Sequence, residues 1–203
     1  MLKKFTIACT FLASTLLSAS AQEDPALMGT ESLEPQVRFA TSHGEFVVQL
    51  DGKLAPITVK NFLVYVDAGF YDGMIFHRVI SGFMIQGGGF EEGMRQRKNE
   101  ALGLPMEPII NEGYNGLKND KYTIAMARTS VPDSATSQFF VNVNDNAQLN
   151  YIEDKNPGYA VFGRVISGED VVDKIAKVET GSEAGHQDVP LETVKILSAR
   201  RNN

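Results

Sequence analysis

The sequence predicts a mainly β protein built as a closed antiparallel barrel with two helices. Three observations support this fold class. Short apolar runs of strand length alternate with Gly, Asn, Asp and Pro over most of the chain. Two segments have the pattern of a helix, and they do not separate the strands in the regular order of a βαβ sheet. The apolar fraction of 43% is enough to fill one core.

The first 21 residues have the layout of a secretory signal peptide. Lys3 and Lys4 precede an apolar run over residues 5–17, and Ala-Ser-Ala follows at 19–21. A membrane span is the alternative, but it needs roughly 20 apolar residues, more than this run contains. We therefore expect export, with cleavage near Ala21-Gln22.

Removal of residues 1–21 would change the composition in two ways that limit function. The only cysteine, Cys9, is lost, so no disulfide can form. Two lysines are lost as well, so the formal net charge of −6 becomes −8. An acidic chain without a basic stripe argues against nucleic acid or an anionic membrane surface as a partner. No later apolar stretch approaches membrane length.

Residues 22–36 are polar and contain two prolines, which predicts a flexible lead-in before an ordered domain over residues 37–200. That domain begins with a β-hairpin around His43-Gly44, because apolar and polar residues alternate on both sides. Pro56 opens a helix whose apolar residues recur at i, i+3, i+4 and i+7, and Gly69 ends it. The apolar helix positions are Val59, Phe62, Leu63 and Val66.

The rest of the domain reads as short strands, a second helix and a last strand. The helix is predicted over residues 169–178, with acidic residues at its start and lysines near its end, as the helix dipole favours. The last strand is predicted over residues 191–199. The intervening strands are predicted at residues 74–78, 83–86, 123–127, 138–143 and 160–165.

Several kinds of site are not supported by the residues present. Gly87, Gly88 and Gly89 lack the Gly-Lys-Ser/Thr of a phosphate loop and are interpreted as a tight turn with close backbone approach. Residues 142–153 resemble a calcium loop but lack its leading Asp and its sixth-position Gly. The three histidines lie in different contexts, which argues against a metal centre. His77 is interpreted as a packed histidine, and no Gly-x-Ser-x-Gly nucleophile motif is present.

Arg78 stands out because it lies in an apolar, strand-like run. A salt bridge at the barrel rim or a side chain that reaches solvent along its stem would account for a single arginine. A catalytic cation is the third interpretation. The surrounding motifs decide between them.

Five segments resemble the signature of the cyclophilins, the peptidyl-prolyl cis-trans isomerases. They occur in the order of that family and at compatible spacing, and the resemblance covers about residues 37–200. The resemblance implies an eight-stranded antiparallel barrel capped by two helices, and isomerase activity without a cofactor or metal. The segments are Phe-His-Arg-Val-Ile at 76–80, Gly-Phe-Met-Ile-Gln-Gly-Gly at 82–88, Ala-Met-Ala-Arg at 125–128, Ser-Gln-Phe-Phe-Val at 137–141 and Tyr-Ala-Val-Phe-Gly-Arg-Val at 159–165.

The resemblance also implies a site. Arg78 and Gln86 match the catalytic positions, and Gln86 is expected to bind the substrate backbone and to help orient Arg78. At Arg128 the family pattern assigns a main-chain clamp for an extended peptide, although the side chain departs from the more usual asparagine. The substrate-binding positions are Phe83, Met84, Ala127, Arg128, Gln138, Phe140, Leu149 and Tyr159.

Rotation of an X-Pro bond explains why these residue types suffice. No bond breaks, so neither a nucleophile nor a metal is needed. The barrier of about 18–20 kcal/mol falls if a fixed donor stabilises the twisted amide, whose prolyl nitrogen is pyramidal and more basic. Arginine keeps its proton and offers several donors in a planar fork.

The expected partners are proline-containing unfolded or extended polypeptides exported to the periplasm, and the protein is expected to be a monomer. Weak cyclosporin binding is expected, because Gln148 stands where many eukaryotic relatives carry the tryptophan that the resemblance ties to tight binding of the drug. One alternative is a proline-peptide binding module or holdase with little turnover. Another is a barrel that carries a small apolar ligand, but five phenylalanines are expected to fill the interior: Phe39, Phe46, Phe76, Phe139 and Phe162.

Overall fold

The computed structural model describes residues 33–97 and 107–202. The predicted signal peptide and residues 22–32 of the predicted lead-in lie outside this part of the chain. Within the described residues, no helix is both long and apolar enough to cross a bilayer.

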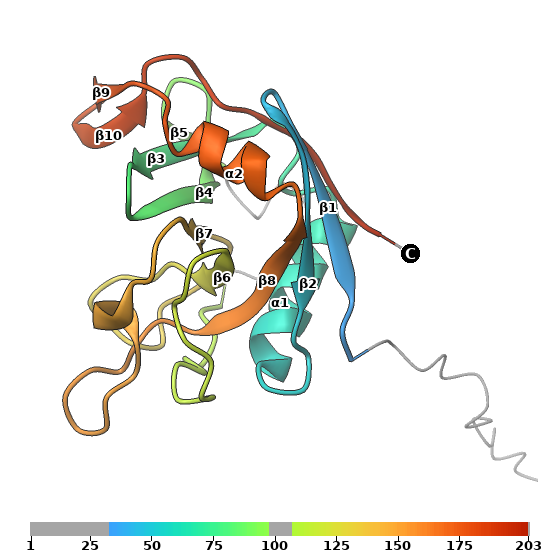
Figure 1. Cartoon of the computed structure of the whole chain (residues 1–203), viewed down its shortest axis with the longest axis vertical. Helices are drawn as coiled ribbons and strands as arrows, with labels where there is room; N and C mark the ends of the chain where they lie inside the picture. The colour runs from blue at the N-terminus through green and yellow to red at the C-terminus, as the bar shows by residue number, and fades with distance from the viewer. Residues whose placement is uncertain (1–32, 98–106, 203) are drawn as a thin grey trace, which may run out of the picture. The chain divides into compact units, whose positions relative to one another are not determined.

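Most strands form one antiparallel sheet that curls into a nearly closed barrel (Figure 1). Eight strands follow each other in the order β11-β1-β2-β8-β6-β7-β4-β3, and the short β5 pairs with β4 outside this path. β9 and β10 form a separate hairpin. The bounds are β1 Gln36–Thr41, β2 Gly44–Leu50, β3 Met74–Ile80, β4 Met84–Glu91, β5 Arg95–Gln96, β6 Thr123–Met126, β7 Phe139–Asn142, β8 Val161–Ser167, β9 Thr180–Glu183, β10 His186–Pro190 and β11 Ile196–Arg201.

The barrel nearly closes where β3 meets the segment that leads into β11. The Phe76 amide donates to the Val194 carbonyl at 2.9 Å, and the Gly73 amide donates to the Ile196 carbonyl at 2.8 Å. These bonds satisfy backbone groups that would otherwise form two open sheet edges. The predicted eight-stranded antiparallel barrel is confirmed.

Phenylalanine side chains fill the barrel, as the alternation along the strands predicts. In β1, Val37 and Phe39 are fully buried while Arg38 between them faces solvent, because successive side chains point to opposite faces. Phe39 stacks on Phe46 of β2 with ring centroids 4.8 Å apart, and it lies 5.4 Å from Phe139 of β7. The five phenylalanines expected in the interior are all buried. A packed interior excludes an open cavity for a small apolar ligand.

Two α-helices lie at opposite ends of the barrel (Figure 1). α1 spans Pro56–Asp67, begins with proline in its first turn as predicted, and packs Phe62 against Phe162 with ring centroids 5.1 Å apart. α2 spans Glu169–Ile175, which is three residues shorter than predicted. α1 lacks a side-chain cap of its own. Glu112, from a distant loop, supplies one.

The C-terminal end of the domain corrects the prediction. The last strand begins at Ile196, not at residue 191, and Leu191 is 68% exposed. The hairpin β9–β10 was not predicted, because its sequence is largely polar and its buried side chains are confined to Val189 and Pro190. It packs on β3 over a small apolar cluster that includes Ile75 and Val189.

The glycines at 87–89 correct another prediction. They do not form a turn but lie inside β4, which runs unbroken from Met84 to Glu91. The predicted close packing of neighbouring atoms against these glycines is confirmed. A Cβ added to Gly89 would lie 2.5 Å from Cδ of Gln138, and one added to Gly88 would lie 2.8 Å from the Ser137 carbonyl oxygen.

Candidate active site

A row of outward-facing side chains crosses five neighbouring strands of the barrel. Arg78 on β3 is paired with Gln86 on β4, and Gln86 is paired with Phe140 on β7. Phe140 is in turn paired with Ala125 on β6, and Ala125 with Val161 on β8. Because directly paired residues of neighbouring strands point to the same side of a sheet, these residues share the outer face. The sheet register thus places a cation, an amide and an apolar patch in one line.

The apolar part of this row continues into a shallow pocket of about 120 Å³. Met84 and Phe140 are almost fully buried although they lie outside the barrel, because they form a second apolar cluster separate from the interior. The ring of Tyr159 meets Phe140 edge-on at 5.7 Å. The pocket is lined by Arg78, Phe83, Met84, Gln86, Ala127, Arg128, Phe140, Leu149 and Tyr159. All predicted site residues except Gln138 therefore line one surface.

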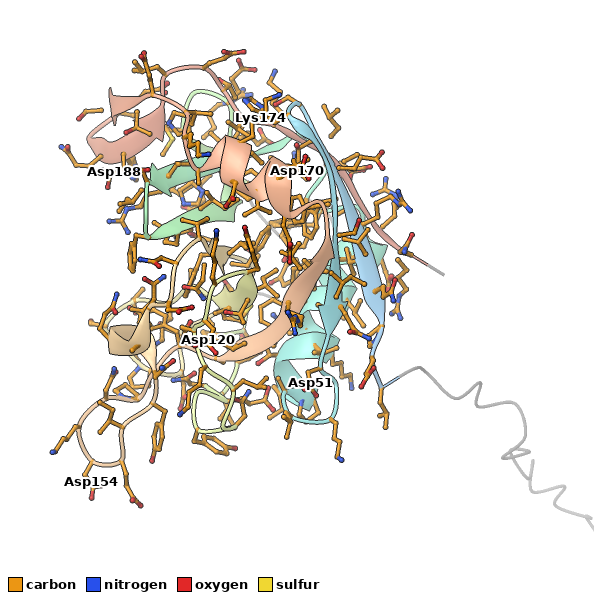
Figure 2. The ribbon with its side chains drawn as sticks, viewed as in Figure 1. Asp51, Asp120, Asp154, Asp170, Lys174 and Asp188 are labelled. Atoms are coloured by element: carbon orange, nitrogen blue, oxygen red, sulfur yellow. The ribbon has the colours of Figure 1, made fainter. Side chains whose placement is uncertain are left out.

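Arg78 is held by a residue that the sequence interpretation missed. Its Nε lies 3.3 Å from Oδ2 of Asp188, on β10, and both side chains are about half-exposed. Figure 2 shows Asp188 on the hairpin beside the ends of β3 and β4. Asp188 has a φ of 61°, a left-handed conformation that is uncommon for a residue other than glycine. Only folding brings it to Arg78, which precedes it by 110 residues.

Among the described residues, the Gln86 side chain makes no hydrogen bond with Arg78, although the two are paired across β3 and β4. Its Nε2 donates to Oε1 of Gln138 at 3.0 Å. Gln138 therefore lies behind Gln86 and orients its amide. That Gln86 helps to orient Arg78 stays a prediction, and the two residues are direct cross-strand neighbours on β3 and β4.

The main chain at Arg128 is open, as a peptide clamp requires. Ala127 donates its amide to the Gln138 carbonyl at 3.0 Å, which ties this segment to the sheet. Among the described residues, no hydrogen bond engages the main-chain N–H or C=O of Arg128. Both groups stand at the rim of the pocket and can pair with an extended chain.

A network of buried asparagines positions the pocket's far side. Asn146 donates from Nδ2 to the Phe83 carbonyl at 2.8 Å and to Oδ1 of Asn142 at 2.7 Å. Leu149 lies in the 3₁₀ turn Ala147–Leu149 that follows, and its carbonyl accepts from the Tyr159 amide at 3.0 Å. The stretch that resembles a calcium loop thus supports the pocket. The asparagines at 142, 144 and 146 are the feature of the sequence from which this supporting role could have been predicted.

His77 is buried under the hairpin, on the strand that carries Arg78. The ring centroid lies 4.7 Å from that of Phe90, and Nδ1 has no hydrogen-bond partner among the described residues. Burial first, and nearby His186 second, lower the pKa of His77 to about 4. His77 is therefore neutral at pH 7. It lies inside β3 as a packed residue, as predicted.

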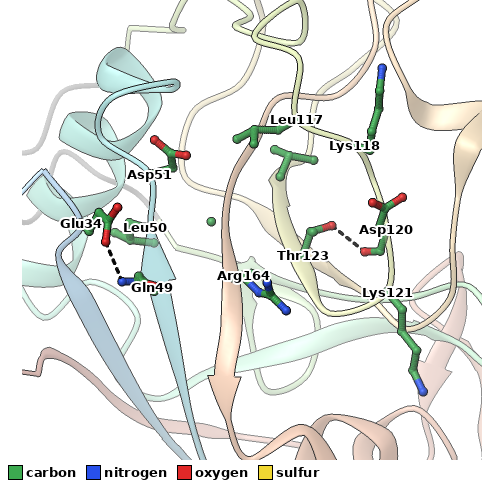
Figure 3. A pocket seen from close by; sticks show the side chains of 12 residues that line it. Glu34, Gln49, Leu50, Asp51, Leu117, Lys118, Asp120, Lys121, Thr123 and Arg164 are labelled. Carbon is green, nitrogen blue, oxygen red and sulfur yellow. Dashed lines mark hydrogen bonds between the residues drawn. The ribbon is translucent and has the colours of Figure 1, made fainter.

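A larger hollow, of about 300 Å³, shares no residue with the pocket (Figure 3). Its rim mixes acidic and basic side chains, including Asp51, Asp120 and Arg164. On one side of it, Nε2 of Gln49 donates to Oε2 of Glu34 at 3.0 Å (Figure 3). Its apolar lining comes from Leu50, Leu117 and Val161, and none of the predicted site residues lies among the described residues that line it.

Comparisons with known proteins agree with this geometry. Residues 36–201 match the family described as cyclophilin type peptidyl-prolyl cis-trans isomerase/CLD. The chain belongs to the cyclophilin family. It is 58% identical to peptidyl-prolyl cis-trans isomerase cyp18 of Streptomyces antibioticus over 81% of this chain and 96% of that protein. A cyclophilin-type isomerase of Cryptosporidium parvum has the same fold, with a TM-score of 0.66 at 27% identity over 84% of this chain and 98% of that one.

Within the cyclophilins, the chain is close to the bacterial A and B isomerases. It is 55% identical to isomerase B of Escherichia coli over 80% of this chain and 96% of that protein. It is 48% identical to isomerase A of Dickeya dadantii over 92% of this chain and 93% of that protein. The motifs and the predicted signal peptide led to the expectation of a likeness to periplasmic cyclophilin A, and the identities show the coarser group of bacterial A and B isomerases. The protein is a peptidyl-prolyl cis-trans isomerase and acts on proline-containing peptides.

Proposed function

We propose that this cyclophilin accelerates X-Pro rotation in exported proteins through a hydrogen bond from Arg78 to the prolyl nitrogen. The observation that carries the proposal is the row in which Arg78 and Gln86 adjoin the apolar seat around Phe140. A proline ring held on that seat would place its nitrogen toward the guanidinium. Gln86 would hold the substrate backbone, and the open main chain of Arg128 would hold the flanking residues.

The Arg78 guanidinium offers several N–H groups that could donate to the prolyl nitrogen. Its Nε–H points to Asp188, and the described contacts leave its four terminal N–H groups without a protein acceptor. A donor aimed at the prolyl nitrogen binds the twisted state more tightly than either planar one, because only the twisted nitrogen carries a localised lone pair. About 7 kcal/mol of such preference would give a rate factor near 10⁵.

The experiment compares kcat/KM for an Ala-Pro peptide between wild type, Arg78→Ala and Arg78→Lys. We expect Arg78→Ala to lose two or more decades and Arg78→Lys to recover little, since lysine lacks the fork. Arg38→Ala is the matched control, because Arg38 is also a half-exposed arginine in an ion pair, with Glu45. If Arg78→Ala keeps the wild-type rate, the groove acts as a proline-peptide binding module and Arg78 is structural.

The cellular setting is a proposal of its own. A mature chain that begins at Gln22 and acts as a monomer in the periplasm would meet unfolded exported chains. N-terminal sequencing of the exported protein and its mass in solution test these points. Weak cyclosporin binding stays a prediction. Gln148 is exposed at the pocket's edge and offers no indole to the drug.

A further inference from the structure

Two arginines flank the proline pocket, and among the described residues no acidic side chain lines it. Arg78 and Arg128 are its charged residues, and the others are apolar or neutral. The chain as a whole carries a formal charge of −6. The pocket is therefore a cationic patch on an acidic protein, which is a setting in which charge selects partners.

The two charges are not equivalent. Arg78 lies against the carboxylate of Asp188, which offsets its charge. Arg128 has neutral partners: Nε and Nη2 donate to the Gly158 carbonyl at 3.1 and 3.0 Å, and Nη1 donates to the Thr129 carbonyl at 2.9 Å. Its Cζ lies 4.3 Å from the centroid of the Tyr159 ring. Among the described residues, no carboxylate lies within ion-pair distance of Arg128.

Arg128 is also held in place before any substrate arrives. Three hydrogen bonds and the contact with the Tyr159 ring restrict a side chain that would otherwise lose rotamer entropy on binding. Those bonds use three of the five guanidinium N–H groups, so two remain for a carboxylate. The charge thus lies at the rim where the proposed main-chain clamp would hold the residues that flank proline.

We infer that Arg128 is a specificity-determining residue that favours client segments with an acidic side chain beside the X-Pro bond. The inference rests on the proposed function, because it assumes that substrates occupy this groove. An aspartate or glutamate at the flanking position would receive two charge-assisted hydrogen bonds, and a lysine there would be repelled. Asparagine, more usual in relatives at this position, would give no such selection.

The test uses peptides with one Ala-Pro bond that differ only by Glu, Gln or Lys, placed before or after that pair. We expect wild type at low salt to show, at one of the two positions, a kcat/KM for Glu about three- to tenfold above that for Lys, with Gln between. The ratio should fall toward one in 0.5 M salt. The readout is the ratio of kcat/KM for the Glu peptide to kcat/KM for the Lys peptide. A variant that loses activity equally on both peptides therefore leaves this ratio unchanged.

Arg128→Gln should abolish the preference. Arg164→Gln is the matched control, since it removes one exposed charge that lines the separate hollow and should keep the preference. Equal rates for Glu and Lys peptides in wild type, or the same ratio in Arg128→Gln, would overturn the inference. The proposed function fails separately, if the unmodified Ala-Pro peptide is not isomerised or Arg78→Ala isomerises it as fast as wild type.

Discussion

Arg78 on β3 and Asp188 on β10 form an ion pair, with Nε 3.3 Å from Oδ2. The pair joins the barrel to the β9–β10 hairpin, and the hairpin packs on β3 beneath it. A half-exposed pair contributes little stability. Its consequence is geometric, because a carboxylate on Nε restricts the plane of the fork whose other donors face the pocket.

Asp188→Asn tests that geometric role. We expect kcat/KM for an Ala-Pro peptide to fall about three- to tenfold, because the fork loses a charged partner, while unfolding stability changes by less than about 0.5 kcal/mol. Asparagine tolerates the left-handed φ of 61°, so the backbone should persist. Adding Asp188→Asn to Arg78→Ala should cost nothing further. Additive losses in the double variant would show that Asp188 acts independently of Arg78.

Gly89→Ala should impair catalysis through Gln138. The new methyl group would meet the Gln138 side chain at 2.5 Å and push it away from Gln86, to which it is hydrogen-bonded. We expect kcat/KM to fall by about tenfold, with a stability loss of about 1–3 kcal/mol from overpacking. Gly93→Ala is the control for catalysis: its Cβ meets nothing within 4 Å, so kcat/KM should persist, although the φ of 75° makes alanine strained there and costs stability. A Gly89→Ala variant with wild-type rate would contradict this coupling.

His77 should make the fold sensitive to acid. Its pKa is about 4 in the folded state, below the ordinary 6.5 that it regains on unfolding. Between these values the unfolded chain binds a proton that the folded chain does not, so stability falls as pH drops from 6.5 to 4. The loss at pH 4.5 should be about 2–3 kcal/mol.

Urea unfolding at pH 7 and 4.5 measures this effect. His77→Asn should lose less stability between the two pH values than wild type does, by about 2–3 kcal/mol. His43→Asn, in the half-exposed turn between β1 and β2, is the control for the loss of one histidine outside the packed strand. If wild type and His77→Asn lose stability equally, another group controls the acid response.

Glu112 should contribute to stability as the missing cap of α1. Its carboxylate is buried and accepts from the Thr58 amide at 2.8 Å, the Thr58 hydroxyl at 2.6 Å and the Ile57 amide at 3.2 Å. Glu112→Ala leaves these donors unpaired near a helix N-terminus and should cost about 2–4 kcal/mol in urea unfolding. Glu112→Gln keeps one acceptor and should cost less. Equal stability of wild type and Glu112→Ala would refute the capping role.

Much of the barrel and of the pocket could be predicted from the sequence, because both depend on local periodicity and motifs. Alternation placed Phe39 and Phe46 inside, and the motifs predicted the apolar seat around Phe140. The errors have a common cause. The hairpin that carries Asp188 is polar, and the glycines before Phe90 look like a turn, although they lie inside β4. In both places the long-range packing determines the structure, and local propensity does not report it.

The sequence by itself determined the strand pattern, the family and the identities of the pocket residues, since these follow from the order of residue types along the chain. The tertiary structure alone decided which charges are paired. Asp188 lies 110 residues from Arg78, and Gly158 lies 30 residues from Arg128. A difference between two arginines, one beside a carboxylate and one beside carbonyls, arises only when the folded chain brings distant segments within hydrogen-bonding range.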